Sequence, residues 1–394
     1  MKVVVLKETR SGERRTALVP EGARTLVRQE LEVRVSKGAG MGAGIADAEY
    51  RAAGALVADQ AEALVGADLV LGVNPPSAEV VDALSAGTIL VSFLDPLGNP
   101  ALAASLAGRG VTAVAMELVP RVTRAQSMDA LSSQATVAGY RAALLAAHHL
   151  PKFLPMFTTA AGTIRPASAL VLGAGVAGLQ AIATLRRLGA VVKAFDVRPG
   201  VKEQVESLGA SFLESEEEVA AEGEGGYAAE LTEDQHDKEL ALIASAIDKS
   251  DVVVTTAQIP GRPAPVLVTR AMLDSMADGS VVVDLAGEDG GNCEAARNGE
   301  IVVESGVTVI APDNLPATLP VHASSMYSRN IVALVGEMIG EHGVLAIDPD
   351  NDVLGPATLT RDGEIADDRV RAAVFARNDP RSGRSLSSSQ AEIR

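Results

Sequence analysis

Short runs of apolar, β-branched residues alternate with Ala-rich or amphipathic stretches along the first third of the chain. Runs of this length predict buried strands, and the stretches between them are long enough for helices. Strands that alternate with helices predict a parallel, doubly wound sheet of the α/β class. The predicted strands lie at residues 3–6, 33–36, 67–73, 87–93 and 111–116.

A second series of apolar runs follows further along the chain and repeats the same alternation. It predicts a second Rossmann-like sheet, so we expect two α/β domains rather than one. The predicted strands of this second sheet lie at residues 168–175, 190–196, 251–257, 280–286 and 307–312.

Two long helices are predicted to join these domains. From Asp129 to His149 the apolar residues recur at helical spacing, and Pro151 follows as a stop. A second helix, predicted over residues 324–341, would carry the chain back to the first domain and make that domain discontinuous. The expected boundaries are 1–132 plus 322–367 for the first domain and 133–321 for the second.

Two segments are predicted to be mobile. Residues 214–233 combine many Glu residues with several glycines, at a point where a Rossmann sheet should be entering its next helix. They therefore predict an inserted loop. Residues 368–394 include a serine run at 386–389 and are predicted to form a disordered tail.

Composition narrows the classes of function. The chain has 47% hydrophobic residues but no Trp and only 3% aromatic residues, so Ala, Val, Leu and Ile must fill the cores, as in buried parallel sheets. A net charge of −17 argues against a nucleic-acid partner, because phosphate binding needs an excess of Lys and Arg on one face. The five histidines form no i, i+4 metal pair, so no metal site is expected.

The same composition predicts a cytoplasmic protein. Cys293 is the single cysteine, which excludes a disulfide framework and fits a reducing compartment. The first seven residues read as a strand rather than as a signal peptide. No apolar run reaches the length of about 18 residues that a membrane span requires, so any membrane role is expected to depend on partner chains.

The motif Gly173-Ala174-Gly175-Val176-Ala177-Gly178 lies between a predicted strand and a predicted helix. In a dinucleotide site the first glycine permits the tight turn, the second lets the pyrophosphate approach the backbone, and the third lets helix and strand pack closely. The motif therefore predicts a dinucleotide site, with a glycine-rich turn that binds no ligand as the alternative.

Asp196 ends the next predicted strand, where a carboxylate can accept hydrogen bonds from the adenosine ribose hydroxyls. Arg198 could instead receive the 2′-phosphate of NADP, but the neighbouring Asp196 would repel that group. We therefore expect NAD(H) rather than NADP(H).

The segment PRVTRAQSMDALSSQ at residues 120–134 resembles the nicotinamide-side loop of the proton-translocating NAD(P) transhydrogenases, in the alanine dehydrogenase/transhydrogenase superfamily. The resemblance covers nearly everything before the tail. It implies that the chain is the NAD(H)-binding component, which passes hydride to NADP+ on a partner. Further resembling segments are Lys7-Glu8, 196–210, 255–267, 284–294 and 324–341.

The resemblance also implies which residues form the site. Arg121, Gln126, Asp129 and Ser132 would surround the nicotinamide, with Gln126 reaching toward the second nucleotide. Hydride transfer moves no proton, so such a site needs orienting hydrogen-bond groups rather than a strong base. A salt bridge between Arg121 and Asp129 at a helix start is the alternative. The implied cofactor contacts are Ser127, Met128, Gly173, Gly175, Val176, Gly178, Asp196, Val197, Arg198, Gly226, Ala257 and Gln258, although Gln258 stands where an apolar residue is expected.

Gly226 and Tyr227 resemble the tip of the mobile loop that closes over NAD(H) in the family. A lid of this kind excludes water, so Tyr227 would act as a gate rather than as a reacting group. A flexible solvated loop is the alternative.

Alanine dehydrogenases share the Lys-Glu pair and Arg15, so the fold alone does not decide the activity. Their Lys and His, which serve amino-acid oxidation, are replaced here by Asn74 and Asp95. Because Asn does not titrate and Asp would repel a substrate carboxylate, we do not expect this activity, and Arg15 is expected to form a structural ion pair. A nonenzymatic NAD(H)-binding regulator, which would not need Gln126, is a third possibility.

The resemblance implies partners as well. No second glycine-rich loop in the right context is present, so NADP(H) is expected on a separate subunit, and the proton pathway in membrane-spanning subunits. A homodimer at the cytoplasmic face of the membrane is also implied.

Overall fold

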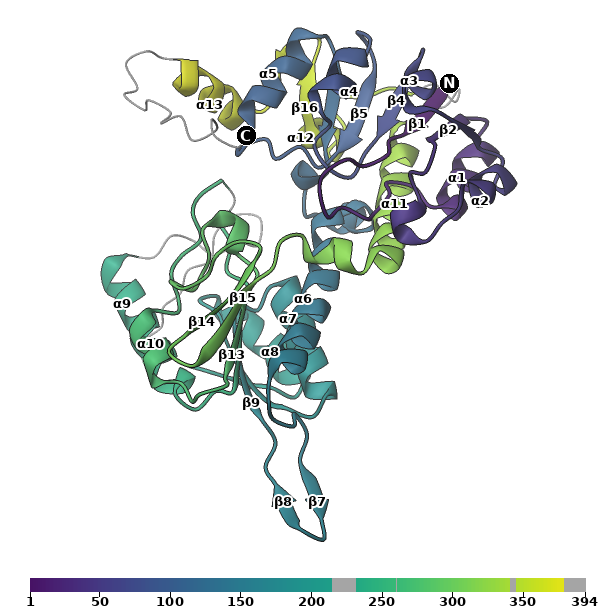
Figure 1. Cartoon of the computed structure of the whole chain (residues 1–394). Helices are drawn as coiled ribbons and strands as arrows, with labels where there is room; N and C mark the ends of the chain where they lie inside the picture. The colour runs from purple at the N-terminus through teal and green to yellow at the C-terminus, as the bar shows by residue number, and fades with distance from the viewer. Residues whose placement is uncertain (215–231, 260, 341–344, 379–394) are drawn as a thin grey trace, which may run out of the picture.

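The computed structural model describes residues 1–214, 232–259, 261–340 and 345–378 (Figure 1). Within these ranges the two predicted α/β sheets are both confirmed, each with a mainly parallel, Rossmann-like order. Several short strands near the sheet edges and in a separate hairpin were not predicted.

The first sheet has the order β17-β16-β6-β5-β4-β1-β2-β3. Its six N-terminal strands are parallel, while β16 returns from the C-terminal region of the chain and pairs antiparallel with β6. The first domain is therefore discontinuous, as predicted. Its strands are β1 (Lys2–Val5), β2 (Glu32–Ser36), β3 (Leu56–Ala58), β4 (Leu69–Leu71), β5 (Ile89–Ser92), β6 (Thr112–Ala115), β16 (Thr358–Arg361) and β17 (Glu364–Ile365), and its helices are α1 (Pro20–Arg28), α2 (Asp47–Ala52), α3 (Gln60–Leu64), α4 (Ala78–Ala83), α5 (Pro100–Gly108) and α12 (Leu354–Ala357).

The second sheet has the order β11-β10-β9-β12-β13-β15-β14, with β14 antiparallel at one edge. The central β9 lies between β10 and β12, which is the point where the strand order reverses and where ligands bind in this fold class. Its strands are β9 (Ser168–Leu172), β10 (Val191–Phe195), β11 (Ser211–Phe212), β12 (Val252–Thr255), β13 (Val281–Asp284), β14 (Glu300–Glu304) and β15 (Val307–Ala311), and its helices are α7 (Val176–Arg187), α8 (Lys202–Ser207), α9 (Glu233–Ile247) and α10 (Arg270–Ser275).

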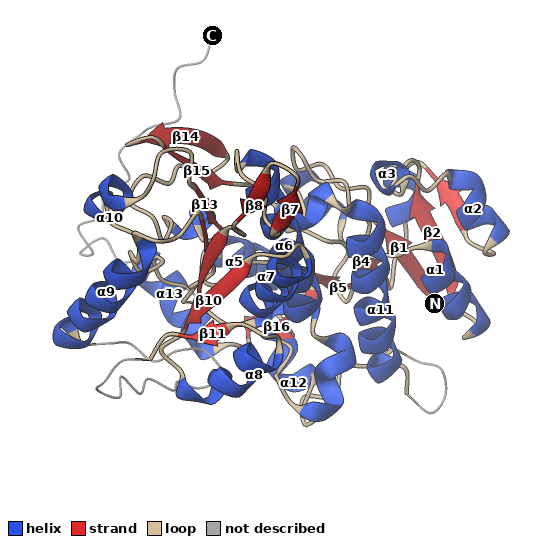
Figure 2. Ribbon diagram, turned by 90° about the horizontal axis from the view of Figure 1, so that it is seen from below, coloured by secondary structure: helices blue, strands red, loops and turns tan. Residues whose placement is uncertain are grey.

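Two long helices, α6 (Ala130–His149) and α11 (Pro320–Met338), connect the domains, and α6 lies between the two sheets in both views (Figures 1 and 2). Gly139 allows α6 to approach α7 closely, because a Cβ added there would lie 2.0 Å from the Ala177 oxygen. Ser133 on α6 donates to Asn330 on α11 at 2.7 Å. The helices thus hold the glycine motif of the second domain against the first domain.

The prediction of a disordered tail from residue 368 is wrong for its first eleven residues. Residues Asp368–Asn378 form helix α13, and Val370 is fully buried against Leu359. Asp367 begins this helix by accepting hydrogen bonds from the backbone nitrogens of Arg369 and Val370, at 2.8 and 3.2 Å. Burial of Val370 therefore orders a segment whose polar composition suggested disorder.

A hairpin of β7 (Phe157–Thr159) and β8 (Gly162–Ile164), also not predicted, projects from the second domain (Figure 1). The predicted loop at 214–233 falls mostly outside the described residues, and α9 begins at its end, with Thr232 capping the helix. In the described ranges, no helix is long and apolar enough to cross a membrane.

Candidate functional site

A cleft of about 890 Å³ lies between the two domains, at the carboxyl ends of the strands of the second sheet. Both domains supply its walls. The second domain contributes the glycine motif and the ends of β10 and β12, while the first contributes the ends of its own strands and the N-terminal loop. Predicted site residues that line it are Arg121, Ser132, Gly173, Gly175, Val176, Asp196, Val197, Arg198, Ala257 and Gln258.

The glycine motif has the geometry that a pyrophosphate needs. Gly173 has a φ of +96°, and a Cβ added at Gly178 would lie 1.9 Å from the Gly173 oxygen, so the turn packs directly on α7. By contrast, the nearest atom to a Cβ added at Gly175 is Arg198 Nη2, at 4.0 Å. The space above Gly175 is therefore open beside the N-terminus of α7, which favours an anion there.

Asp196 connects this turn to the end of β10. It is 8% exposed, and its Oδ2 accepts a hydrogen bond from the Ala174 nitrogen at 2.7 Å. Arg198 donates to the same carboxylate from Nε at 2.9 Å and from Nη2 at 2.8 Å. A ribose hydroxyl that binds Asp196 would therefore share this carboxylate with Arg198, which also neutralises its charge.

The loop after β12 is held by Asn292, whose side chain is fully buried. Its Oδ1 accepts from the Ala257 nitrogen at 3.0 Å, and its Nδ2 donates to the oxygens of Ala257 and Pro265 at 2.9 and 2.8 Å. Gln258, which departs from the expected apolar residue, donates to Asp289 Oδ2 at 3.0 Å. The amide at this position thus has a defined partner beside the cleft.

On the opposite side of the cleft, Asp129 caps the N-terminus of α6. Its carboxylate accepts hydrogen bonds from the Ser132 nitrogen at 2.8 Å and from Ser132 Oγ at 2.6 Å. The structure therefore brings Asp129 and Ser132 together, and it places Ser132 and Arg121 on the wall of the cleft.

Gln126, Ser127 and Met128 lie in a 3₁₀ helix over Thr123–Met128. Gln126 and Ser127 are exposed and are not among the described residues that line the cleft, while Met128 is 4% exposed and packs in the core of the first domain. Arg124 anchors this segment by ion pairs with Glu337 and Asp352. Gly226 and Tyr227 lie outside the described residues.

Sequence reasoning did not identify the buried polar network behind the first-domain wall. Arg15 forms the expected structural ion pair, with Nη2 at 2.7 Å from Glu13 Oε2, and both side chains are almost fully buried. Arg15 also donates to Gln134 at 3.0 Å and to Asn314 at 3.2 Å. Burial acts to raise the pKa of Glu13, but hydrogen bonds and charge from Arg15, with help from Asn74 and Asn314, lower it to about 2.

Glu117 is a second residue that was missed. Its Oε1 accepts from the nitrogens of Leu94 and Asp95, at 2.8 and 2.5 Å, and burial raises its pKa to about 7 despite these bonds. Within the described chain, its Oε2 is one of six buried side-chain polar atoms without a hydrogen-bond partner, and Glu117 is the one residue of that set that lines the cleft. Its place directly after the buried strand β6 was the available sequence signal.

Comparison with known proteins agrees with this arrangement. Residues 4–138 match the family described as "Alanine dehydrogenase/PNT, N-terminal domain", and residues 142–368 match its C-terminal domain. The chain is 44% identical to an NAD(P) transhydrogenase subunit alpha protein of Rhodospirillum rubrum over 93% of this chain and 97% of that protein. It is 29% identical to an alanine dehydrogenase of Mycobacterium tuberculosis over 94% and 96% of the two chains. A crystal structure of transhydrogenase from Sinorhizobium meliloti superposes with a TM-score of 0.84 and 45% identity, over 93% of this chain and 100% of that one.

Proposed function

The chain belongs to the alanine dehydrogenase/PNT family, and on that premise we propose that it is the NAD(H)-binding component of a NAD(P) transhydrogenase. The observation that carries the proposal is one cleft with a dinucleotide turn on one wall and, on the other, hydrogen-bonding side chains that include Arg121 and Ser132. When bound there, NADH would supply a hydride to NADP+ held by a partner subunit.

The residues of the second domain fit the adenosine half of the ligand. Asp196 would accept the ribose hydroxyls, and the backbone nitrogens at Gly175 and Val176 would face the pyrophosphate. Four further residues with implied cofactor contacts line the same cleft, which supports NAD(H) as the nucleotide that this chain binds. They are Val197, Arg198, Ala257 and Gln258.

The first-domain wall supports hydride transfer over amino-acid oxidation. Asn74 Nδ2 already donates to Glu8 at 2.8 Å and to Glu13 at 3.0 Å, so this amide is bound in a structural role. Arg15 is neutralised by Glu13. An alanine carboxylate would also meet Asp95 and Glu117, two further acids on the same wall. An alanine dehydrogenase-like activity is therefore the weaker candidate.

Arg121, Asp129 and Ser132 would orient the nicotinamide. Because Gln126 is exposed on a firmly anchored segment, it is suited to reach a nucleotide on another subunit, with Ser127 and Met128 shaping the backbone of the loop. Tyr227 and Gly226 would close over the bound nucleotide as a lid.

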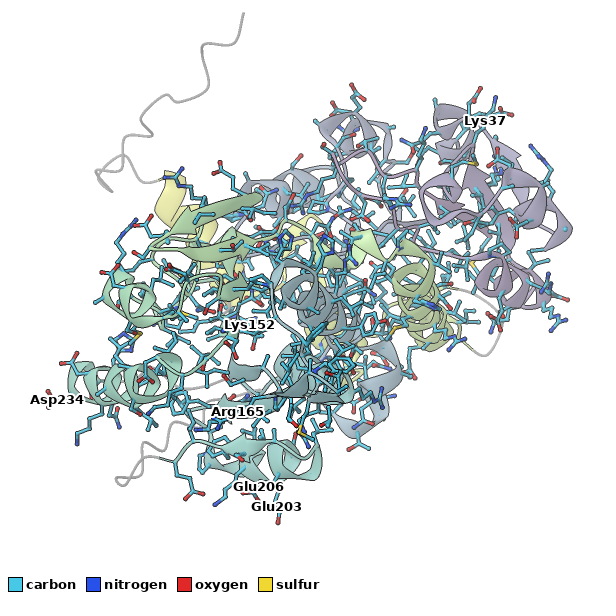
Figure 3. The ribbon with its side chains drawn as sticks, turned by 60° about the horizontal axis from the view of Figure 1, so that its bottom comes forward. Lys37, Lys152, Arg165, Glu203, Glu206 and Asp234 are labelled. Atoms are coloured by element: carbon cyan, nitrogen blue, oxygen red, sulfur yellow. The ribbon has the colours of Figure 1, made fainter. Side chains whose placement is uncertain are left out.

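The partners proposed are an NADP(H)-binding subunit and membrane-spanning subunits that couple the transfer to proton movement, with this chain at the cytoplasmic face of the membrane. Self-association is supported by exposed apolar side chains in the β7–β8 hairpin and just before it. All four are more than 40% exposed: Phe153, Met156, Phe157 and Ile164. Lys152 and Arg165 lie on the same region of the second domain and line a second pocket at the base of the hairpin (Figure 3). Sedimentation of the purified chain tests the homodimer.

The deciding experiment is hydride exchange. The purified chain is mixed with the NADP(H)-binding domain of a transhydrogenase, NADH and an oxidised NADP analogue, with L-alanine plus NAD+ as the parallel assay. Rapid exchange that falls at least about tenfold in Gln126→Ala is expected, while exposed Gln204→Ala on α8 serves as the matched control. Alanine-dependent NADH formation would contradict the proposal. NADH binding without activity in either assay would favour a nonenzymatic regulator.

A further inference from the structure

Beside the cleft, the two domains are in direct contact. The turn at residues 95–99 of the first domain brings Leu97 against Gly261 of the second. A Cβ added at Gly261 would lie 2.7 Å from Leu97 Cδ1 and 3.2 Å from Leu97 Cβ, so only glycine leaves room for this side chain. Asp95 and Gln258, close to the contact on either side, line the cleft.

The first-domain turn is held in place by Glu117. Its Oε1 accepts from the nitrogens of Leu94 and Asp95, which precede Leu97 by three and two residues. Asp95 has a φ of +49°, which non-glycine residues seldom adopt, and its Oδ1 accepts from the Gly98 nitrogen at 3.1 Å. The backbone oxygen of Asp95 also accepts from the Asn99 nitrogen at 2.7 Å. A strained residue persists in this way only when its surroundings fix it.

The second-domain loop that contacts Leu97 is also constrained. The Arg262 nitrogen donates to the Ile259 oxygen at 3.1 Å, and Gly261 has a φ of +73°. The buried Asn292 side chain fixes both ends of the loop through Ala257 and Pro265. Leu97 and Gly261 therefore meet between two stretches of backbone that are each held by hydrogen bonds.

We propose that the contact of Leu97 with Gly261 is an interdomain clasp, which sets how firmly the cleft closes on its nucleotide. Leu97 is then a positioning residue: it controls nucleotide release without touching the reacting atoms. Because both domains wall the cleft, release requires them to separate, and separation must break this contact. The inference rests on the proposed function only in taking the ligand to be NAD(H).

Charged groups near the clasp act on domain closure in opposite directions. Burial raises the pKa of Asp289, the Gln258 hydrogen bond lowers it, and the charge of Asp95 raises it further, so these two carboxylates repel each other across the gap. Elsewhere at the domain boundary, Arg10 forms ion pairs with Glu288 at 2.7 Å and with Asp313 at 3.0 Å. The packing of Leu97 and the pairs of Arg10 favour closure, while the two acids favour opening.

The test is a double-mutant cycle on NADH release. Gly261→Ala, Leu97→Ala and the double variant are compared by stopped-flow fluorescence, with excess NAD+ displacing bound NADH. Gly261→Ala is expected to speed release about tenfold, because the new methyl group holds the domains apart, and Leu97→Ala about threefold. In the double variant the 2.7 Å clash with Leu97 Cδ1 is absent and only the 3.2 Å approach to Cβ remains, so release should be slower than in Gly261→Ala alone. Exposed Leu56→Ala on β3 is the matched control.

Release that is faster in the double variant than in either single variant would overturn the clasp, because strain at the positive φ of Gly261 alone gives additive effects. Unchanged release in Leu97→Ala would overturn it as well, even if Gly261→Ala fails to fold. Single-turnover hydride transfer from bound NADH should stay unchanged in Leu97→Ala, which separates positioning from loss of structure. Failure of the wild type to bind NADH would refute the proposed function instead, and coupling of the two substitutions in urea unfolding would then still test the contact.

Discussion

The two walls of the cleft are built in different ways. On the second-domain wall, Gly173, Gly178, Asp196 and Arg198 contact each other within one strand–turn–helix–strand unit. On the first-domain wall, Arg15 is held by its neighbour Glu13 and by two groups from distant regions of the chain, Gln134 and Asn314. Local spacing thus fixes the wall that would bind the adenosine half, whereas the wall that would hold the nicotinamide depends on the assembled fold.

The largest expected effect is on the first-domain wall, in Arg15→Met. The variant leaves the Glu13 carboxylate buried without its cation, so we expect it to lower the free energy of unfolding by about 3 to 5 kcal/mol in urea titrations. Exposed Arg28→Met on α1 should change it by less than about 0.5 kcal/mol. A loss below about 1 kcal/mol in Arg15→Met would show that the network is not structurally important.

This prediction has a pH dependence. The pKa of Glu13 is lowered to about 2, so its stabilising contribution is present above its ordinary pKa of 4.5 and is lost as the pH falls toward 2. Between pH 4.5 and 2, the free energy of unfolding should therefore fall less steeply in Arg15→Met than in the wild type.

The next largest effects are expected at the glycine motif of the second-domain wall. Two substitutions there distinguish a loss of packing from a loss of NADH binding. Gly178→Ala places a methyl group on the Gly173 oxygen, so we expect about 1 to 3 kcal/mol of lost stability and about 100-fold weaker NADH binding. Gly175→Ala meets only open space and should weaken NADH binding while leaving the unfolding midpoint unchanged. Equal stability losses in both variants would contradict this division.

A smaller effect is expected in Asp196→Asn. The ribose contact loses its charged acceptor and Arg198 loses its partner, so NADH affinity should fall about tenfold while NADPH affinity rises. Fluorescence titration with both nucleotides measures this, with exposed Glu203→Gln on α8 as the control. An unchanged ratio of the two affinities would show that Asp196 does not discriminate between them.

The smallest effect is expected in Glu117→Gln. Because burial raises the pKa of Glu117 to about 7, its contribution to stability is present below 4.5 and is lost as the pH rises through 7. Removing the buried charge should therefore stabilise the protein at pH 8 by about 1 kcal/mol and leave it nearly unchanged at pH 5. A variant that is equally destabilised at both pH values would contradict a charge effect.

The difference between the walls also explains what the sequence could predict. The β-branched runs located both sheets, and the glycine motif with Asp196 located one wall, because these signals lie within single short segments. Glu13 lies two residues from Arg15, but its other partners, Asn74 and Asn314, come from distant elements. The place of Glu117 after β6 was a weak signal, because the nitrogens that it binds follow β5. The exposed hairpin around Phe157 lacked a burial pattern, and α13 depends on the burial of Val370 against Leu359 of β16, which was not predicted as a strand.

The most direct test of the central claim is equilibrium binding of NADH and NADPH to the purified chain. We expect saturable NADH binding at one site per chain, at least about tenfold tighter than NADPH binding. Equal affinity for the two nucleotides, or no binding of NADH, would contradict it.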